Sequence, residues 1–174
     1  QLEFISMCTG GFPEPFTFGM RAKWHLGRIR KKYDIVHDNQ SLAYGLVGIA
    51  AQGYPLVATI HHPITMDRDA EIKAAGSWLG RMRVRRWYAF LAMQKRVARR
   101  ISPIITVSAC SRRDIGVEFG IPSERFRVVP NGINTDCFYP LSGVVRARDR
   151  LLVTNSADMP LKGIRYLIEA VAAI

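Results

Sequence analysis

The sequence predicts an α/β protein with a mostly parallel sheet and flanking helices. Short β-branched runs alternate along the chain with helical segments of ten or more residues, which is typical of βαβ units. Several of these runs end at a polar turn, where open parallel sheets bind their ligands. Hydrophobic residues make up 48% of the 174 residues and charged residues 22%, which excludes a disordered chain.

The first quarter of the chain predicts a loop, a helix and a strand. Residues 1–15 contain two adjacent glycines and two prolines, which indicate the end of a strand and a loop. Residues 16–32 predict a helix with a basic end, and residues 34–37 a short strand. Ser41 is expected to cap a helix over residues 41–51, which Gly53 closes.

The middle of the chain predicts a strand followed by a long helix. Residues 56–60 form a β-rich run that ends at His61-His62-Pro63, since proline stops a strand. Residues 77–100 predict one amphipathic helix with a spacing of about 100° per residue. Its apolar side is expected to hold Val84, Trp87, Phe90, Leu91, Val97, Ala98 and Ile101.

Residues 104–107 predict the next strand, and Ser108 at its end is a candidate helix cap. Ser111 and Asp114 fit a capping box for a helix that runs to Phe119 and ends at Gly120.

The last part of the chain predicts a turn, a linker and the start of a second sheet. Residues 127–129 are the expected strand before a turn at Pro130-Asn131-Gly132, and residues 136–148 resemble a linker. Residues 151–154 predict a new strand, and Lys162 opens the last helix. We place the domain boundary between residues 1–142 and 143–174.

Several classes of protein and site are excluded or disfavoured. Three cysteines without metal-like spacing argue against a disulfide framework and for a reducing, cytoplasmic setting. No apolar run reaches the roughly 18 residues of a membrane span, and the start does not resemble a signal peptide. There is no Walker loop, G-x-G-x-x-G motif, zinc spacing or nucleophile elbow, so we expect no metal or bound cofactor. We expect the protein to continue beyond both ends.

Two places in the sequence are candidate ligand sites. His61 and His62 follow a strand that we expect to be buried, where an imidazole can bind a sugar hydroxyl or a phosphate. The alternative is that one of the two imidazoles satisfies backbone groups at the strand end. Lys162 and Gly163 begin a helix, where N–H groups and a lysine favour a phosphate, although solvated lysines are common there.

A basic segment accounts for the whole excess of positive charge. Residues 72–113 hold eleven of the 25 basic residues and no acidic residue, so the other 14 basic residues balance the 14 acidic ones. The candidate patch for an anionic partner consists of Arg81, Arg85, Arg86, Lys95, Arg96, Arg99 and Arg100. A solvated outer helix face explains this charge, as does adsorption to an anionic membrane surface. Nucleic acid ranks last because no stacking motif accompanies the charge.

Five motifs together resemble the family-4 retaining glycosyltransferases. They are residues 104–108 (IITVS), 121–126 (IPSERF), 128–134 (VVPNGIN), 138–140 (FYP) and 162–163 (KG). The resemblance implies two Rossmann-like domains that face each other across a cleft. The first binds the acceptor and the second a nucleoside-diphosphate sugar, so the chain holds most of the acceptor-side domain and the beginning of the donor-side domain.

The resemblance also implies roles for individual residues. His61 matches the family's cleft histidine near the transferred sugar, and Lys162 matches its diphosphate-binding lysine. Ser156 stands where the family usually has an arginine, six residues before that lysine. Gly163 and the Asn131-Gly132 pair complete the expected donor-binding set. The family's two glutamates would lie beyond residue 174, so we expect the fragment alone to be inactive.

The leading hypothesis is therefore a cytoplasmic glycosyltransferase. It would move a sugar from a nucleoside-diphosphate donor to a hydroxyl of a carbohydrate or lipid-linked acceptor, with retention and without a metal. A peripheral position on the cytoplasmic face of a membrane is a separate hypothesis. The competing hypotheses are a non-catalytic α/β binding module and a basic fragment that binds membranes or nucleic acid.

Overall fold

The computed structural model describes residues 1–29, 32–145, 147–153 and 163–174. The chain divides into two compact units, Gln1–Pro130 and Asn131–Ile174. The predicted boundary at residue 142 stays a prediction.

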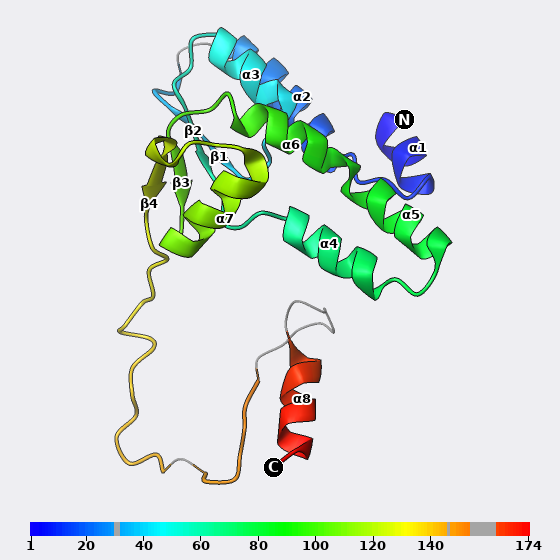
Figure 1. The fold of residues 1–174 in the computed structure, drawn as a ribbon. Helices are drawn as coiled ribbons and strands as arrows, with labels where there is room; N and C mark the ends of the chain where they lie inside the picture. Colours follow the sequence, from blue (N-terminus) through cyan, green and yellow to red (C-terminus); the bar gives the residue numbers. More distant parts are fainter. Residues whose placement is uncertain (30–31, 146, 154–162) are drawn as a thin grey trace. The chain divides into compact units, whose positions relative to one another are not determined.

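The first unit is a parallel α/β sheet with helices, as predicted (Figure 1). Its elements in chain order are α1 (Leu2–Cys8), α2 (Glu14–Arg28), β1 (Val36–Asn39), α3 (Tyr44–Ala51), β2 (Leu56–Thr59), α4 (Thr65–Ala74), α5 (Trp78–Trp87), the 3-10 helix η1 (Tyr88–Phe90), α6 (Leu91–Ala98), β3 (Ile104–Thr106), α7 (Ala109–Phe119), the 3-10 helix η2 (Ser123–Arg125) and β4 (Phe126–Val128). The four strands are all parallel and lie in the order β1-β2-β3-β4. The β1–β2 register pairs Asn39 with Thr59, so the two strands end at the same edge of the sheet.

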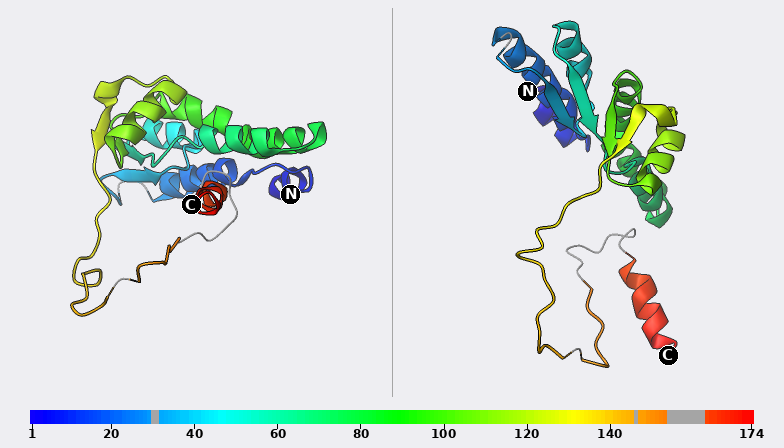
Figure 2. Two further views of the ribbon diagram at one scale, coloured as in Figure 1. Left: turned by 60° about the horizontal axis from the view of Figure 1, so that its bottom comes forward. Right: turned by 90° about the vertical axis from the view of Figure 1, so that its left-hand side faces the viewer.

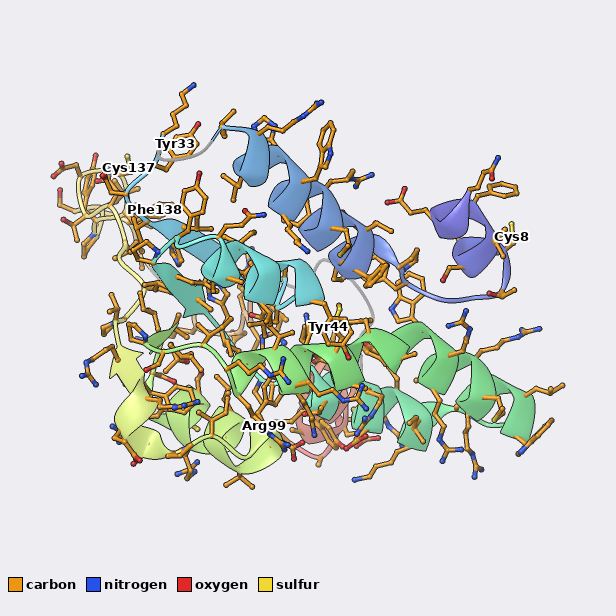
Figure 3. All side chains as sticks on the ribbon, turned by 90° about the horizontal axis from the view of Figure 1, so that it is seen from above. Cys8, Tyr33, Tyr44, Arg99, Cys137 and Phe138 are labelled. Atoms are coloured by element: carbon orange, nitrogen blue, oxygen red, sulfur yellow. The ribbon has the colours of Figure 1, made fainter. Side chains whose placement is uncertain are left out.

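The core lies between the sheet and its connecting helices. Crossover connections between parallel strands are right-handed. Because the four strands follow one another in a single direction across the sheet, these connections place α3, α6 and α7 on the same face of it. In Figure 3, α3 lies between α2 and α6, and both pairs of helices are in contact. The largest fully buried apolar side chains are Leu42, Ile49, Ile60, Leu91, Val97, Ile104, Ile115 and Phe119.

Two glycines allow α2 and α3 to approach closely. Gly19 and Gly45 are both buried, and a Cβ on Gly45 would collide with the Gly19 carbonyl. The α2–α3 pair therefore depends on the absence of a side chain at residue 45.

The predicted start of the chain is wrong, because residues 2–8 form a helix rather than a strand end. Gly10 lies just after this helix with a φ of +74°, and its N–H donates to the Met7 carbonyl at 2.9 Å. The glycines therefore mark the end of a helix, where left-handed glycine is favoured. Helix α4 at residues 65–74 was not predicted from the sequence.

The long helix predicted over residues 77–100 is interrupted. A 3-10 turn at Tyr88–Phe90 separates α5 from α6. Trp87, expected on the buried side, is 45% exposed and stacks on Phe12 with ring centroids 5.0 Å apart. In Figures 1 and 2, α5 extends beyond the sheet, which explains why its predicted apolar side has no core to pack against.

The predicted caps at Ser41 and Ser111 are wrong, whereas the candidate cap at Ser108 is confirmed. Ala43 is the N-cap residue of α3, and the Ser41 hydroxyl donates instead to the carboxylate of Asp38. The cap of α7 is Ser108, whose Oγ accepts from the Ser111 N–H at 3.0 Å. Ser108 lies three residues before Ser111, the first residue of the predicted capping box. The predicted ends of both helices are confirmed, because Gly53 and Gly120 have positive φ angles.

The second unit contains one described helix, α8 (Ile164–Ala172). The turn predicted at Asn131-Gly132 lies instead at residues 135–137, where the Asn134 Oδ1 accepts from the Asp136 N–H at 2.9 Å. Residues 151–153 are not a strand; they are exposed, and the sheet of the first unit does not include them. A strand needs neighbours to pair its backbone groups. Thr154, the predicted end of this strand, and Lys162, the predicted start of the last helix, fall outside the described residues.

Candidate functional site at the carboxyl edge of the sheet

Polar side chains gather where β1 and β2 end. His61 follows β2 by two residues, and its ring Nε2 lies 2.9 Å from the Asn39 Oδ1 at the end of β1. An amide oxygen only accepts hydrogen bonds, so this pairing requires a proton on Nε2 of His61. Among the described residues Nδ1 of His61 has no hydrogen-bond partner, so in this tautomer the lone pair of Nδ1 is left for a ligand.

The neighbouring histidine has a different partner. His62 Nε2 lies 2.9 Å from the Asp67 Oδ2, and the His62 side chain is more than half exposed. Asp67 belongs to the first turn of α4, so this contact ties the loop after β2 to the start of that helix. Of the two histidines, His61 is the one that faces across the sheet edge toward β1.

The loop between β1 and α3 is unusually constrained. Gln40 and Leu42 have φ angles of +62° and +46°, which side chains with a Cβ rarely adopt. Asp38 is 5% exposed, and its Oδ2 accepts from the Leu42 N–H at 2.9 Å. Non-glycine residues in this conformation persist only where their surroundings fix them, and they cluster at functional sites.

The residues predicted for donor binding lie in the second unit. Gly163 is the N-cap residue of α8 with a φ of +70°, and Asn131 and Gly132 lie in irregular, exposed chain. Ser156 and Lys162 fall outside the described residues. Their predicted roles stay predictions.

The predicted basic patch is divided between free and engaged side chains. Every member except the half-buried Lys95 is exposed. Arg86 donates to the Thr9 hydroxyl and Arg96 to the Tyr44 hydroxyl, each at 3.0 Å. Arg99, labelled with Tyr44 in Figure 3, donates from Nε to the Phe119 carbonyl at 2.6 Å. Several of these cations therefore stabilise the first unit as well as charging its surface.

A cavity of about 680 Å³ opens between α4 and the α5–α6 segment. Basic side chains from both sides line it, with one acidic and several apolar residues: Arg68, Lys73, Arg85, Lys95, Asp69, Ile72, Tyr88, Ala89, Leu91 and Ala92. The hydrogen bond from Arg68 holds the pKa of Asp69 below its usual range. Burial, together with the hydrogen bond from its hydroxyl to Glu71, raises the pKa of Tyr88.

Asn39, Gln40 and Gln94 are site residues that were not predicted from the sequence. A signal for the first two is present, because the polar run from Asp38 to Gln40 follows directly on a predicted strand. Gln94 has no such signal, since it lies on a helix 54 residues from the loop that it contacts. The described residues contain no group of three or more His, Cys, Asp or Glu side chains that could hold a metal. No helix among them is both long and apolar enough to span a membrane.

Comparison with known proteins decides the family. A family model for glycosyltransferase family 4 matches residues 5–137. The chain belongs to this family. It is also 49% identical over 172 residues to a protein of Mycolicibacterium hassiacum named MMP alpha-(1->4)-mannosyltransferase. That match covers 99% of the chain and 41% of the relative, so the chain spans less than half of the relative's length. The predicted family and fold are thereby confirmed.

Proposed function

We propose that the chain supplies the acceptor-side half of a retaining glycosyltransferase and the start of its donor-side half. The whole enzyme moves a sugar from a nucleoside-diphosphate donor to a hydroxyl of a carbohydrate or lipid-linked acceptor. Membership of family 4 supports sugar transfer, and the name of the relative makes mannose the first sugar to test. The observation that carries the proposal is the imidazole of His61 at the carboxyl edge of the parallel sheet, where ligands bind in such folds.

The reaction exchanges one bond at the anomeric carbon for another. The bond from that carbon to the diphosphate oxygen breaks, and a bond to the acceptor oxygen forms. The acceptor's hydroxyl proton passes to the departing diphosphate. The relative's name specifies an α-linked product. Formation of such a product from an α-linked donor corresponds to retention.

His61 contacts the transferred sugar in this proposal. Its Nε2–H is committed to Asn39, so Nδ1 accepts a hydrogen bond from a sugar hydroxyl. Such a bond fixes the anomeric carbon relative to the acceptor oxygen, and orientation of this kind lowers the barrier to transfer.

Lys162 and the start of α8 bind the diphosphate. The N-terminal N–H groups of a helix favour an anion, and Gly163 at the N-cap position has no side chain to block it. The ammonium group of Lys162 adds a positive charge where negative charge develops on the leaving group. We assign no metal to the reaction, because these groups supply the charge.

The test is mannose transfer by the full-length protein from nucleoside-diphosphate mannose. We expect His61→Ala to lower kcat and Lys162→Ala to weaken donor binding by about 1–3 kcal/mol, as for a lost charge-assisted hydrogen bond. The exposed His25 and Lys32 provide matched controls, and their alanine variants should keep wild-type kinetics. Unchanged kcat and KM in both site variants would refute the assignment. Donor binding without turnover by the wild type would favour a non-catalytic binding module.

A second proposal, peripheral membrane binding, is supported by the surface of α1 and α5. In Figures 1 and 2, α1 lies beside α5, and Arg86 joins the two by its bond to Thr9. Both helices expose apolar side chains, namely Phe4, Ile5, Met7, Trp78, Leu79 and Met82. Trp78 is 68% exposed and lies three residues from the exposed Arg81, the mixture that favours an anionic bilayer surface.

Vesicle sedimentation tests the membrane proposal. The full-length protein should sediment with anionic but not neutral vesicles, and added salt should weaken the binding. Trp78→Ser should reduce it, whereas Trp24→Ser on the exposed face of α2 serves as control. Equal indifference to both lipids would leave a solvated helix. Steeply salt-dependent retention on DNA or RNA would favour nucleic acid instead.

We also propose the cytoplasm as the compartment. Cys8, Cys110 and Cys137 are all exposed and unpaired, which suits a reducing environment.

A further inference from the structure

The loop after β1 reaches the backbone on both sides of the candidate histidine. The Gln40 Oε1 accepts from the His61 N–H at 2.8 Å, and the Gln40 Nε2 donates to the His62 carbonyl at 3.1 Å. One carboxamide therefore forms hydrogen bonds with one backbone group of His61 and one backbone group of His62. Asn39, the preceding residue, contacts the His61 ring itself.

A buried side chain of α6 fixes the backbone at Gln40. Gln94 is 2% exposed, and its Nε2 donates to the carbonyls of Gln40 and Ser41 at 3.0 and 3.2 Å. These bonds secure a left-handed backbone that glutamine would otherwise avoid. Because the buried amide of Gln94 donates to two loop carbonyls, its main effect is to order the loop.

We infer that Gln40, held by Gln94, is a positioning residue for His61. The inference rests on the proposed function. Gln40 fixes the backbone of His61 so that its ring keeps the Nε2–H bond to Asn39 and presents Nδ1 to the sugar. Without the carboxamide bridge, the backbone at residues 61–62 loses its hydrogen bonds to the loop after β1, and the ring samples other orientations and both neutral tautomers.

Two substitutions at Gln40 separate positioning from backbone strain. Gln40→Asn keeps an amide and tolerates the left-handed backbone, but it is one methylene too short to reach His61 and His62. Gln40→Glu keeps the acceptor for the His61 N–H and loses the donor to the His62 carbonyl. Gln52→Asn is the matched control, because Gln52 lies at the opposite end of α3 and contacts the Lys23 carbonyl.

The readouts are kcat, donor KM and the imidazole ¹⁵N spectrum of His61 in the full-length protein. Wild-type His61 should be in the Nε2–H form. In Gln40→Asn we expect a mixture of tautomers and a fall in kcat on the order of tenfold to a hundredfold, with little change in donor KM. The kcat and the tautomer population of Gln40→Glu should lie between those of wild type and Gln40→Asn. Gln52→Asn should match wild type in both.

The outcomes distinguish this inference from the proposed function. Full activity in His61→Ala would overturn the role of His61 and the positioning with it. Loss of activity in His61→Ala, with wild-type kcat and tautomer in Gln40→Asn, would overturn the positioning alone. If Gln40→Asn fails to fold, Gln40→Glu decides: wild-type kcat and an unchanged ¹⁵N spectrum there would contradict the inference.

Discussion

The close approach of α2 and α3 makes Gly45→Ala a demanding test of the fold. A Cβ at residue 45 would collide with the carbonyl of Gly19 and lie 2.9 Å from the Gly19 Cα. All of these are backbone atoms of the facing helix, so no side-chain rotation relieves the contact. The two helices must move apart.

Two opposing effects set the size of the change. Alanine is a better helix former than glycine by about 1 kcal/mol, which favours the variant. Overpacking against atoms that cannot rotate away costs about 3 kcal/mol, the upper part of the usual range. We therefore expect Gly45→Ala to lower the free energy of unfolding by about 2 kcal/mol.

Gly48→Ala is the matched control in the same helix. Its Cβ would lie 2.5 Å from the Cδ and Cε of Lys23, which belong to a flexible side chain that can swing away. The helix-forming gain should then prevail, giving a change between zero and about 1 kcal/mol of stabilisation. Denaturant unfolding, with hydrogen exchange of the α2 and α3 amides, measures both variants in the full-length protein. Gly45→Ala at least as stable as Gly48→Ala would refute the helix contact.

Two further predictions concern a buried hydrogen bond and a helix end. The Tyr88 hydroxyl donates to the Glu71 Oε1 at 2.6 Å, and burial with this carboxylate raises the pKa of Tyr88 above its ordinary value of 10.0. Its contribution to stability is thus complete below about pH 10 and is lost as the pH rises through the folded-state pKa. A tyrosinate absorbance titration should show one tyrosine that ionises at higher pH than the others, and Tyr88→Phe should remove this transition. The same variant should lower the free energy of unfolding by about 1–2 kcal/mol. Ionisation of all tyrosines together would contradict this. Gly120 ends α7 with a φ of +64°. In thermal unfolding, Gly120→Ala should therefore lower the stability by about 1–2 kcal/mol, and Gly120→Asn should lower it less. Equal losses in the two variants would argue against the left-handed cap.

The strands were predictable because their signals are local. Residues 56–60 and 104–107 are short β-branched runs that end at polar residues, and β2 and β3 lie there. Gly120 likewise marks a helix end within its own neighbourhood. The family motifs identified the chain for the same reason, since each is a contiguous stretch.

The geometry of the site was not predictable because its contacts are distant in sequence. His61 appears as a candidate from its place after a strand, but its partner Asn39 lies 22 residues away. The left-handed conformation of Gln40 depends on Gln94, and no local pattern favours it in a glutamine. The Ser41 cap failed for a different reason, because the buried carboxylate of Asp38, three residues earlier, binds its hydroxyl.

The role of His61 is tested most directly by recording the signals of its ring while the donor binds. Nucleoside-diphosphate mannose is titrated into the full-length protein, and the imidazole ¹⁵N resonances of His61 and His25 are recorded. We predict that the Nδ1 resonance of His61 shifts with donor occupancy while the His25 resonances stay in place. Donor saturation that leaves both His61 nitrogens unmoved would contradict the claim that this ring contacts the transferred sugar.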